Sequence, residues 1–355
     1  MLLKHIGGAV WLFLAFCQGV AVGQMEGGHM SKRAPHEGAG LAFEWVDLRK
    51  FERNPILTPS GADWDQEWFC ACDVIRWRGR YLLYYEARPR GTKRRQIGLA
   101  FSDDGLRWNP SRENPVLKIG PPGSWESFFV GDARVLQAGE ELWMYYIGHD
   151  GRTERIGLAT SRDGVHWMKH PLNPILRESS EGWDRHHVMQ PAAVRLSQDL
   201  WYMWFSSYGP EKENHQTGIA TSSDGVRWQK DPRNPVLRLG PEESWDSVAA
   251  FGVRVLLKDG VYHMLYTGAA QTARYRIGYA FSKDGLHWEK YGGNPILPWG
   301  EPDSWDCRKM SIPIWLPIED DRYRIYYSGD NGVSYLGVGC AEGRLTAISK
   351  RNEAR

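Results

Sequence analysis

The chain has 355 residues, of which 42% are hydrophobic and 25% are charged, the composition of a globular protein with ample material for a core. Its formal net charge is +1. This near-neutral balance excludes the global positive charge that sequence-independent nucleic-acid binding requires, so we expect no nucleic-acid partner.

The first segment in chain order has the pattern of a secretory signal peptide. A short basic start precedes the apolar stretch Ile6–Val22, and small residues at the end of that stretch offer a cleavage site. The stretch is short for a membrane span, so we predict removal of residues 1–23 and no stable membrane insertion. The protein is therefore expected to be secreted or periplasmic. An uncleaved anchor and a lipoprotein attached at Cys17 are the weaker alternatives, and residues 24–40 read as a flexible linker.

A pattern of about sixty residues then recurs along the chain. It opens with Asn-Pro-(Ile/Val)-Leu, continues through Trp-(Asp/Glu) and three predicted strands, and closes with Ser-x-Asp-Gly-x-x-Trp. The copies begin near Asn54, Asn114, Asn173, Asn234 and Asn294. A fixed period of this size, with several short strands in each unit, is typical of a radially repeated β architecture. We predict an all-β fold, a five-bladed β-propeller with four-stranded antiparallel blades around a central channel.

The propeller is predicted to occupy residues 41–345 and to leave residues 346–355 as a C-terminal tail. The fifth copy lacks the final Trp motif, so its outer strand is expected to come from Leu41–Trp45, ahead of the first repeat. That strand would join the two ends of the ring. Residues present in every copy are interpreted as scaffold, and residues that depart from the copies are candidates for function.

Four cysteines would remain after cleavage of the signal peptide. Cys70 and Cys72 share one face of a strand and are poorly placed to bond each other. A bridge from either one to Cys307 is an open possibility, because the last blade neighbours the first in a closed ring. A metal site is less favoured, because no histidine accompanies the cysteines at metal-ligand spacing.

These repeated motifs, together with Ile-Gly-Leu-Ala on the third strand, resemble the five-bladed propeller glycosidases. These are glycoside hydrolase families 43, 32, 68 and 130, with arabinanase-, levansucrase- and invertase-like members. The resemblance covers nearly all of residues 41–345. It implies an enzyme that cleaves glycosidic bonds in an oligo- or polysaccharide. A non-catalytic carbohydrate-binding propeller and a glycoside phosphorylase remain alternatives. We expect a monomer and no cofactor, although the resemblance allows a structural Ca²⁺ in the central channel.

The resemblance also implies carboxylates on the inner strands of the first three blades: a base or nucleophile, an orienting carboxylate and a Glu acid. The family's inner-strand pattern Asp-Pro-x-(Val/Ile) is approximated in the second blade by the segment that begins at Asp132, and the resemblance assigns Asp132 the orienting role. The equivalent positions of the other copies are predicted to hold Ala71, Pro191, Gly252 and Ile312. Asp132 thus departs from the repeat. The alternative is a carboxylate that merely pairs with Arg134 or a neighbouring blade.

Asp73 is the candidate base or nucleophile of the first blade. It lies two residues later than the family pattern requires, but it points to the same face as Ala71 because side chains alternate along a strand. The alternative is a buried aspartate that pairs with Arg134 or Arg254, which align with it in their own blades.

The third blade lacks the expected Glu acid. His187 is a catalytic candidate there, because imidazole titrates near neutral pH, and a paired surface histidine is the alternative. Glu213 in the long loop of this blade is the other catalytic candidate, with Glu211 and Glu86 as alternatives for the acid. The residues assigned to substrate binding are Arg134, His186, Gln190, Arg254, Glu86 and Asp330.

The predicted functional face carries the entries to the inner strands and the loops that join second to third strands. These loops are rich in cations: Arg88, Arg90, Lys93, Arg94, Arg95, Arg152, Arg155, Arg274 and Arg276. A cationic funnel concentrates anionic substrate, so an acidic glycan is our hypothesis for the substrate. The alternative is that each arginine pairs with an acidic neighbour.

Overall fold

The computed structural model describes residues 41–208, 214–271 and 274–349, so the predicted signal peptide and linker lie outside the described residues. The strands are β1 (Leu41–Lys50), β2 (Glu67–Trp77), β3 (Arg80–Arg88), β4 (Gln96–Ser102), β5 (Asn109–Pro110), β6 (Phe129–Ala138), β7 (Glu141–His149), β8 (Glu154–Ser161), β9 (Met168–Lys169), β10 (Met189–Ser197), β11 (Leu200–Tyr208), β12 (His215–Ser222), β13 (Gln229–Lys230), β14 (Ala249–Lys258), β15 (Val261–Ala269), β16 (Arg276–Ser282), β17 (Glu289–Lys290), β18 (Lys309–Pro317), β19 (Arg322–Asp330) and β20 (Tyr335–Ser349). The described part of the chain is thus all-β, as the sequence predicts. None of its segments is a helix long and apolar enough to cross a membrane.

Each copy of the repeat forms a set of antiparallel strands. Strands β6–β9 make a separate four-stranded sheet in chain order. The same order holds for β2–β5, for β10–β13 and for β14–β17. Strands β18, β19 and β20 follow it as well, and β1 pairs with β20, as the sequence predicts for the segment that begins at Leu41.

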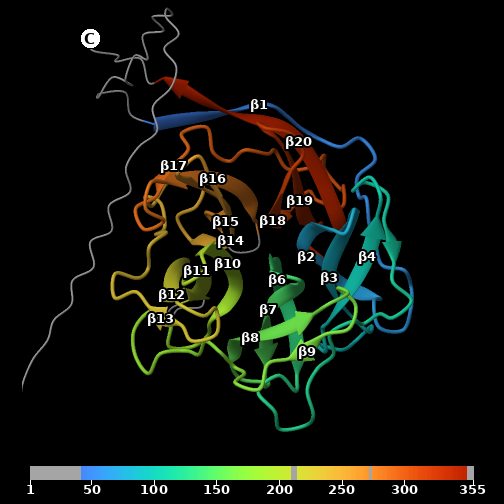
Figure 1. Ribbon diagram of the computed structural model, residues 1–355. Helices are drawn as coiled ribbons and strands as arrows, with labels where there is room; N and C mark the ends of the chain where they lie inside the picture. The colour runs from blue at the N-terminus through green and yellow to red at the C-terminus, as the bar shows by residue number, and fades with distance from the viewer. Residues whose placement is uncertain (1–40, 209–213, 272–273, 350–355) are drawn as a thin grey trace, which may run out of the picture. The chain divides into compact units, whose positions relative to one another are not determined.

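The first strands of successive sets contact one another. Strand β2 contacts β6, β6 contacts β10, β10 contacts β14, β14 contacts β18, and β18 contacts β2. In Figure 1 these strands lie around a common centre. The large clusters of buried apolar side chains lie between neighbouring sets; one of them, for example, contains Tyr84 of β3 and Tyr146 of β7.

The residues shared by the copies serve the scaffold. The Asn114 carboxamide accepts a hydrogen bond from the Leu99 N–H at 2.7 Å and donates one to the Leu99 carbonyl at 3.0 Å. Glu126, from the Trp-(Asp/Glu) motif, accepts a hydrogen bond from the Tyr146 hydroxyl at 2.8 Å and pairs with Lys169 at 2.8 Å. Asn173, Asn234 and Asn294 make the same pair of backbone bonds in their own copies.

Two details differ from the expectations. Strand β20 runs to Ser349, past the predicted boundary at residue 345. The cysteines Cys70, Cys72 and Cys307 are free, so the ring-closing bridge is not formed. The reason is their placement: the first two are buried within β2, whereas Cys307 lies in the partly exposed turn before β18.

Candidate active site

A β-bulge recurs in the inner strands and turns one residue of each toward the centre. The strand register shifts between Gly131 and Arg134 in β6 and between Phe251 and Arg254 in β14. Asp132 in the first of these bulges has a φ of +45°, a backbone conformation that is uncommon for a residue with a side chain. Bulges of this kind often re-aim a side chain beside an active site.

The register of β10 corrects one position of the sequence alignment. Ala192 pairs with Trp204 in β10, just as Arg134 pairs with Tyr145 in β6. The equivalent of Asp132 in the third set is therefore Gln190, which also has a positive φ, of +53°. The predicted Pro191 is one residue too late, because β10 has a second register shift, between Arg195 and Ser197, that adds one residue to the count from the aromatic strand.

A cavity of about 270 Å³ lies on the face that holds the inner-strand entries, the face predicted to be functional. We call it the carboxylate cavity, after three of its residues, Glu86, Asp132 and Glu154. Its other lining residues are Trp68, Cys70, Arg95, Met189, Gln190, Tyr208, His215, Phe251, Ser311, Ile312 and Tyr335.

Glu86, on β3, is held by three hydrogen-bond donors. Its Oε1 accepts bonds from Trp68 Nε1 at 2.7 Å and from Arg95 Nη1 at 2.9 Å. Its Oε2 accepts a bond from the backbone N–H of Asp132 at 3.3 Å. The carboxylate lies so close to Gly131 that a Cβ there would be 1.9 Å from Oε2. Only glycine at position 131 leaves room for this arrangement.

Glu86 departs from the repeat. The other copies carry Ile147, Ser206, Thr267 and Ser328 at this register position. The hydroxyls of the last three each accept the N–H of an inner-strand residue of the next set, at 2.9 to 3.0 Å. A carboxylate replaces this small structural acceptor only in the first set. Alignment of the second strands would therefore have singled out Glu86, which the sequence analysis named for substrate binding and as an alternative for the acid.

The Asp132 carboxyl faces the cavity and is 9% exposed. Its pKa is raised to about 8, mainly because burial disfavours the charged form and then because of the negative charge of Glu86. The positive charge of Arg95 opposes this rise. At neutral pH this side chain therefore holds a proton.

Glu154 opens β8 and is the carboxyl that the sequence analysis missed. Burial raises the pKa of Glu154 to about 7. The positive charge of Arg95 opposes this rise, and the negative charge of Glu86 adds to it. Oε2 of Glu154 lies 3.4 Å from Nδ1 of His187, which also accepts a bond from the Glu154 backbone N–H at 3.1 Å. The His187 side chain is not part of the cavity lining, and it contacts the lining residue Glu154 from outside.

A pattern in the repeat could have revealed Glu154. The residues that open or directly precede the third strands are Arg95, Glu154, His215, Tyr275 and Tyr335. Four residue types occupy these five positions, with tyrosine at both Tyr275 and Tyr335. Such variation at one level of a repeated scaffold is typical of a functional site. Four of them line the carboxylate cavity.

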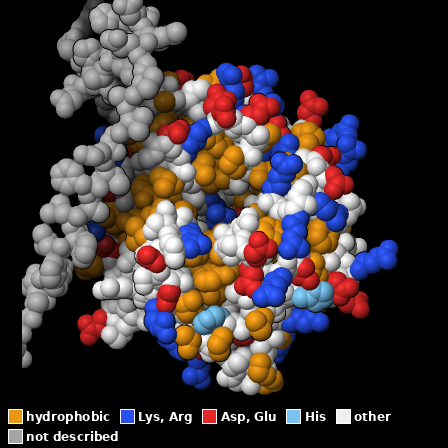
Figure 2. All heavy atoms as spheres, viewed as in Figure 1, with side chains coloured by type: hydrophobic (Ala, Val, Ile, Leu, Met, Phe, Trp, Pro, Cys, Tyr) orange, Lys and Arg blue, Asp and Glu red, His pale blue; other side chains and the backbone are white. Residues whose placement is uncertain are grey.

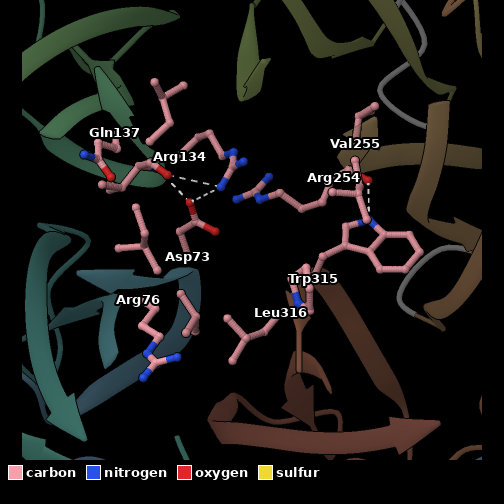
Figure 3. A pocket seen from close by; sticks show the side chains of 14 residues that line it. Asp73, Arg76, Arg134, Gln137, Arg254, Val255, Trp315 and Leu316 are labelled. Carbon is pink, nitrogen blue, oxygen red and sulfur yellow. Dashed lines mark hydrogen bonds and ion pairs between the residues drawn. The ribbon is translucent and has the colours of Figure 1, made fainter. Parts of the chain in front are cut away.

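Asp73, Arg134 and Arg254 line a different cavity, of about 360 Å³, at the opposite ends of the inner strands (Figure 3). Asp73 is fully buried and accepts hydrogen bonds from Arg134 Nη1 at 2.6 Å and from the Val135 N–H at 2.7 Å. Arg254 donates to the carbonyl of Ala133 at 3.2 Å and to that of Cys72 at 2.5 Å. The two cavities share no lining residue. Asp73 and Asp132 therefore do not face a common space.

The remaining predicted residues are dispersed. Gln190 lines the carboxylate cavity, and its buried Oε1 has no hydrogen-bond partner. His186 lies near the surface, where it accepts a hydrogen bond from Arg185 Nε at 3.1 Å. Asp330 is buried outside the lining and pairs with Lys309 at 3.2 Å. Glu213 lies outside the described residues.

Acidic or aromatic partners engage much of the predicted cationic funnel. Arg155 pairs with Glu178 at 2.7 Å and with Asp150 at 3.0 Å, and Arg88 lies 3.6 Å from Glu67. Arg95 pairs with Glu86 in the same way. Figure 2 shows Lys and Arg interspersed with Asp and Glu over the viewed face. Acidic neighbours thus offset the charges of Arg88, Arg95 and Arg155, whereas Arg274 and Arg276 lie over the Trp299 ring.

Metal ligation finds little support in the part of the chain that the structure describes. No group of three or more His, Cys, Asp or Glu side chains there is arranged to hold a metal ion. The three carboxyls of the carboxylate cavity share their space with the Arg95 guanidinium instead.

Glycosidases place a pair of carboxyls at the bond that they cleave, and the carboxylate cavity holds three carboxyls within an all-β scaffold. The model of the glycosyl hydrolases family 32 N-terminal domain matches residues 72–234 and 199–311, which together cover more than half of the chain. The chain belongs to this family of glycoside hydrolase- and phosphorylase-like proteins.

Relatives agree with this placement. An uncharacterized protein of Mycobacterium tuberculosis, Rv1502, is 28% identical over 300 residues, which cover 81% of this chain and 96% of that protein. A 1,2-beta-oligomannan phosphorylase of Thermoanaerobacter is 25% identical over 64% of this chain and 73% of its own length. The beta-1,2-mannobiose phosphorylase of Listeria innocua, solved with beta-1,2-mannobiose, superposes with a TM-score of 0.65 at 16% identity. The superposition covers 84% of this chain and 97% of that one, and at this identity it supports the fold alone.

Proposed function

We propose that the protein hydrolyses a glycosidic bond in the carboxylate cavity, with Asp132 as the general acid. The observation that carries this proposal is the convergence of Glu86, Asp132 and Glu154 on one cavity beside Arg95. Glycoside cleavage needs one carboxyl that is protonated and another that is ionised. The sequence left open a binding protein without an acid, and this convergence favours catalysis.

The environments of the three carboxyls suggest a division of roles. Asp132, with a pKa of about 8, donates its proton to the oxygen of the leaving group. Glu154, with a pKa of about 7, is partly ionised at neutral pH and accepts a proton from the attacking water. Glu86 is occupied by three donors, so it positions Asp132 and helps to keep that carboxyl protonated. Asp73 has no part in this scheme, because Arg134 and Val135 hold it at the other cavity.

The lining favours a neutral sugar at the point of cleavage. Arg95 is the only lysine or arginine of the lining and is already paired with Glu86, and Asp132 is protonated. An anionic group would therefore find no unpaired arginine or lysine there and would be repelled by the partly ionised Glu154. The unpaired Oε1 of Gln190 can accept a hydrogen bond from a sugar hydroxyl. We therefore place any acidic groups of the glycan outside this cavity.

Phosphorolysis is the second candidate, since two relatives are named as phosphorylases that act on β-1,2-linked mannosides. It would require inorganic phosphate in the place of the attacking water. The same carboxyls that favour a neutral sugar disfavour a phosphate dianion, which is why hydrolysis comes first.

Two further proposals concern the whole chain. We propose that the five sets of strands close into a five-bladed propeller, supported by the contacts that run from β2 through β6, β10, β14 and β18 back to β2 and by the pairing of β1 with β20. We also propose export after removal of residues 1–23, supported by the basic, apolar and small-residue pattern of that segment. N-terminal sequencing of secreted protein that still begins at Met1 would contradict the second proposal.

The first experiment incubates the purified protein with a panel of neutral and acidic oligosaccharides, β-1,2-mannosides included, with and without inorganic phosphate. Free sugar released without phosphate, and lost in Asp132→Asn, supports hydrolysis. Sugar phosphate formed only with phosphate identifies a phosphorylase. Binding without any release would leave a carbohydrate-binding protein.

A further inference from the structure

The second cavity has the features of a ligand site that glycoside cleavage does not use. It lies at the opposite ends of the inner strands, and its volume of about 360 Å³ is within the range of small-molecule pockets. Asp73, Arg134 and Arg254 form its charged base, with Arg76 and Gln137 among its other polar lining residues (Figure 3). The rest of its lining is apolar: Val74, Ile75, Val135, Leu136, Val255, Leu256, Trp315, Leu316 and Pro317.

The base of this cavity carries more positive than negative charge. Asp73 forms an ion pair with Arg134 at 2.6 Å, and in Figure 3 the Arg254 guanidinium points toward that of Arg134. Arg254 is 2% exposed and donates to three backbone carbonyls, but its Nε has no hydrogen-bond partner. No carboxylate in the described part of the chain lies within ion-pair distance of Arg254, and burial lowers its pKa. A buried cation without a paired anion destabilises its surroundings.

The Arg134 side chain is 22% exposed, so a ligand in the cavity can reach its guanidinium. Arginine binds carboxylates well, because its planar donors match the two carboxylate oxygens. The Trp315 ring gives the cavity a fixed wall: its Nε1 donates to the Arg254 carbonyl at 2.8 Å, and the ring stacks on Trp45 at 5.8 Å.

We propose that this cavity binds a small carboxylate with an apolar body, the carboxylate lying on Arg134 above the charge of Arg254. The carboxylate offsets the excess positive charge, and the apolar body packs on the aliphatic wall and Trp315. The sugar hydroxyls of a glycan would find few polar partners on that wall. The site is independent of the proposed hydrolysis, since it shares no lining residue with the carboxylate cavity.

Titration calorimetry tests the site with two matched probes, hexanoate and hexan-1-ol, and with inorganic phosphate as a charge without an apolar body. We expect hexanoate to bind one site per chain at least about tenfold more tightly than either control, a difference of about 1.4 kcal/mol. Equal affinity for hexanoate and hexan-1-ol, or no binding of hexanoate, would overturn the proposal.

Variants locate the site. Arg134→Met removes the reachable cation and is expected to abolish the preference for hexanoate. Because this change also deprives Asp73 of its partner, a second variant, Leu136→Trp, fills the cavity from its partly buried wall and leaves the charges in place. We expect it to weaken hexanoate binding at least about tenfold, and unchanged binding in a folded Leu136→Trp protein would refute the site. Gln190→Ala, in the other cavity, is the matched control and should bind hexanoate as the wild type does.

Discussion

The Oε2 atom of Glu86 accepts a hydrogen bond from the backbone nitrogen of Asp132 at 3.3 Å, across the boundary between two sets of strands. This contact fixes the two carboxyls relative to each other without any side-chain hydrogen bond between them. The negative charge of Glu86 therefore acts on the Asp132 proton through a rigid arrangement, and each prediction about the site depends on it.

Removing the acid tests the assignment most directly. Asp132→Asn keeps the shape of the side chain but cannot donate the proton, so we expect kcat/KM to fall about 10²- to 10⁴-fold. Steady-state kinetics on the substrate found by the oligosaccharide panel measure the effect. A folded variant with wild-type activity would exclude Asp132 as the acid.

The same variant should be more stable than the wild type in alkaline solution. The pKa of Asp132 is raised to about 8 in the folded protein, against about 3.9 for an ordinary aspartate. The folded state therefore holds a proton that the unfolded state releases, and stability falls as pH rises from about 4 to about 8. Asparagine does not ionise and avoids this loss. Thermal melting should show a higher Tm for Asp132→Asn at pH 8 and a smaller difference at pH 4. An equal difference at both pH values would contradict the raised pKa.

The pH profile of activity should be a narrow bell. Its alkaline limb reflects the loss of the Asp132 proton near pH 8, and its acid limb reflects protonation of Glu154 near pH 7. Because the carboxyls interact, the two limbs report apparent values for the cluster as a whole. Glu154→Gln should remove the acid limb and lower kcat, as rates measured from pH 5 to pH 10 would reveal. An acid limb that persists in this variant would assign the base elsewhere.

The glycine beneath Glu86 offers a test of positioning. In Gly131→Ala the new Cβ would lie 1.9 Å from Oε2 of Glu86, so the carboxylate must move. We expect kcat to fall at least about tenfold, a loss of at least about 1.4 kcal/mol of transition-state stabilisation. Gly292→Ala is the matched control, because nothing lies within 4 Å of a Cβ there. Similar kinetics for the two variants would show that the exact placement of Glu86 is unimportant.

Trp68 is expected to act through Glu86. Trp68→Phe retains an aromatic ring but removes the Nε1 donor that lies 2.7 Å from Oε1 of Glu86. A hydrogen bond to a charged group contributes about 1.5–3 kcal/mol, so we expect kcat to fall about tenfold or more with little change in KM. The pH profile should also shift, because a less firmly held carboxylate changes the field at Asp132. A rise in KM alone would make Trp68 a substrate contact instead.

The repeat made the scaffold predictable, because period, turn residues and strand pattern all agree in every copy. The same repeat pointed to Asp132, the carboxylate that interrupts it. The repeat did not place Asp73 correctly. It lies two residues beyond Ala71 on the same strand, but the strand register shifts between these two residues, and Asp73 lines the second cavity instead of the carboxylate cavity. Glu154 was missed because its role depends on which residues of neighbouring strands lie side by side. That pairing can be worked out only when the positions of the β-bulges are known.

Arg254 reaches from β14 to carbonyl groups of β2 and β6, between the two cavities. We therefore expect a sugar released at Asp132 to leave by the mouth through which the substrate entered. Product and substrate then use the same cavity mouth. We expect the released sugar to inhibit the enzyme competitively as it accumulates.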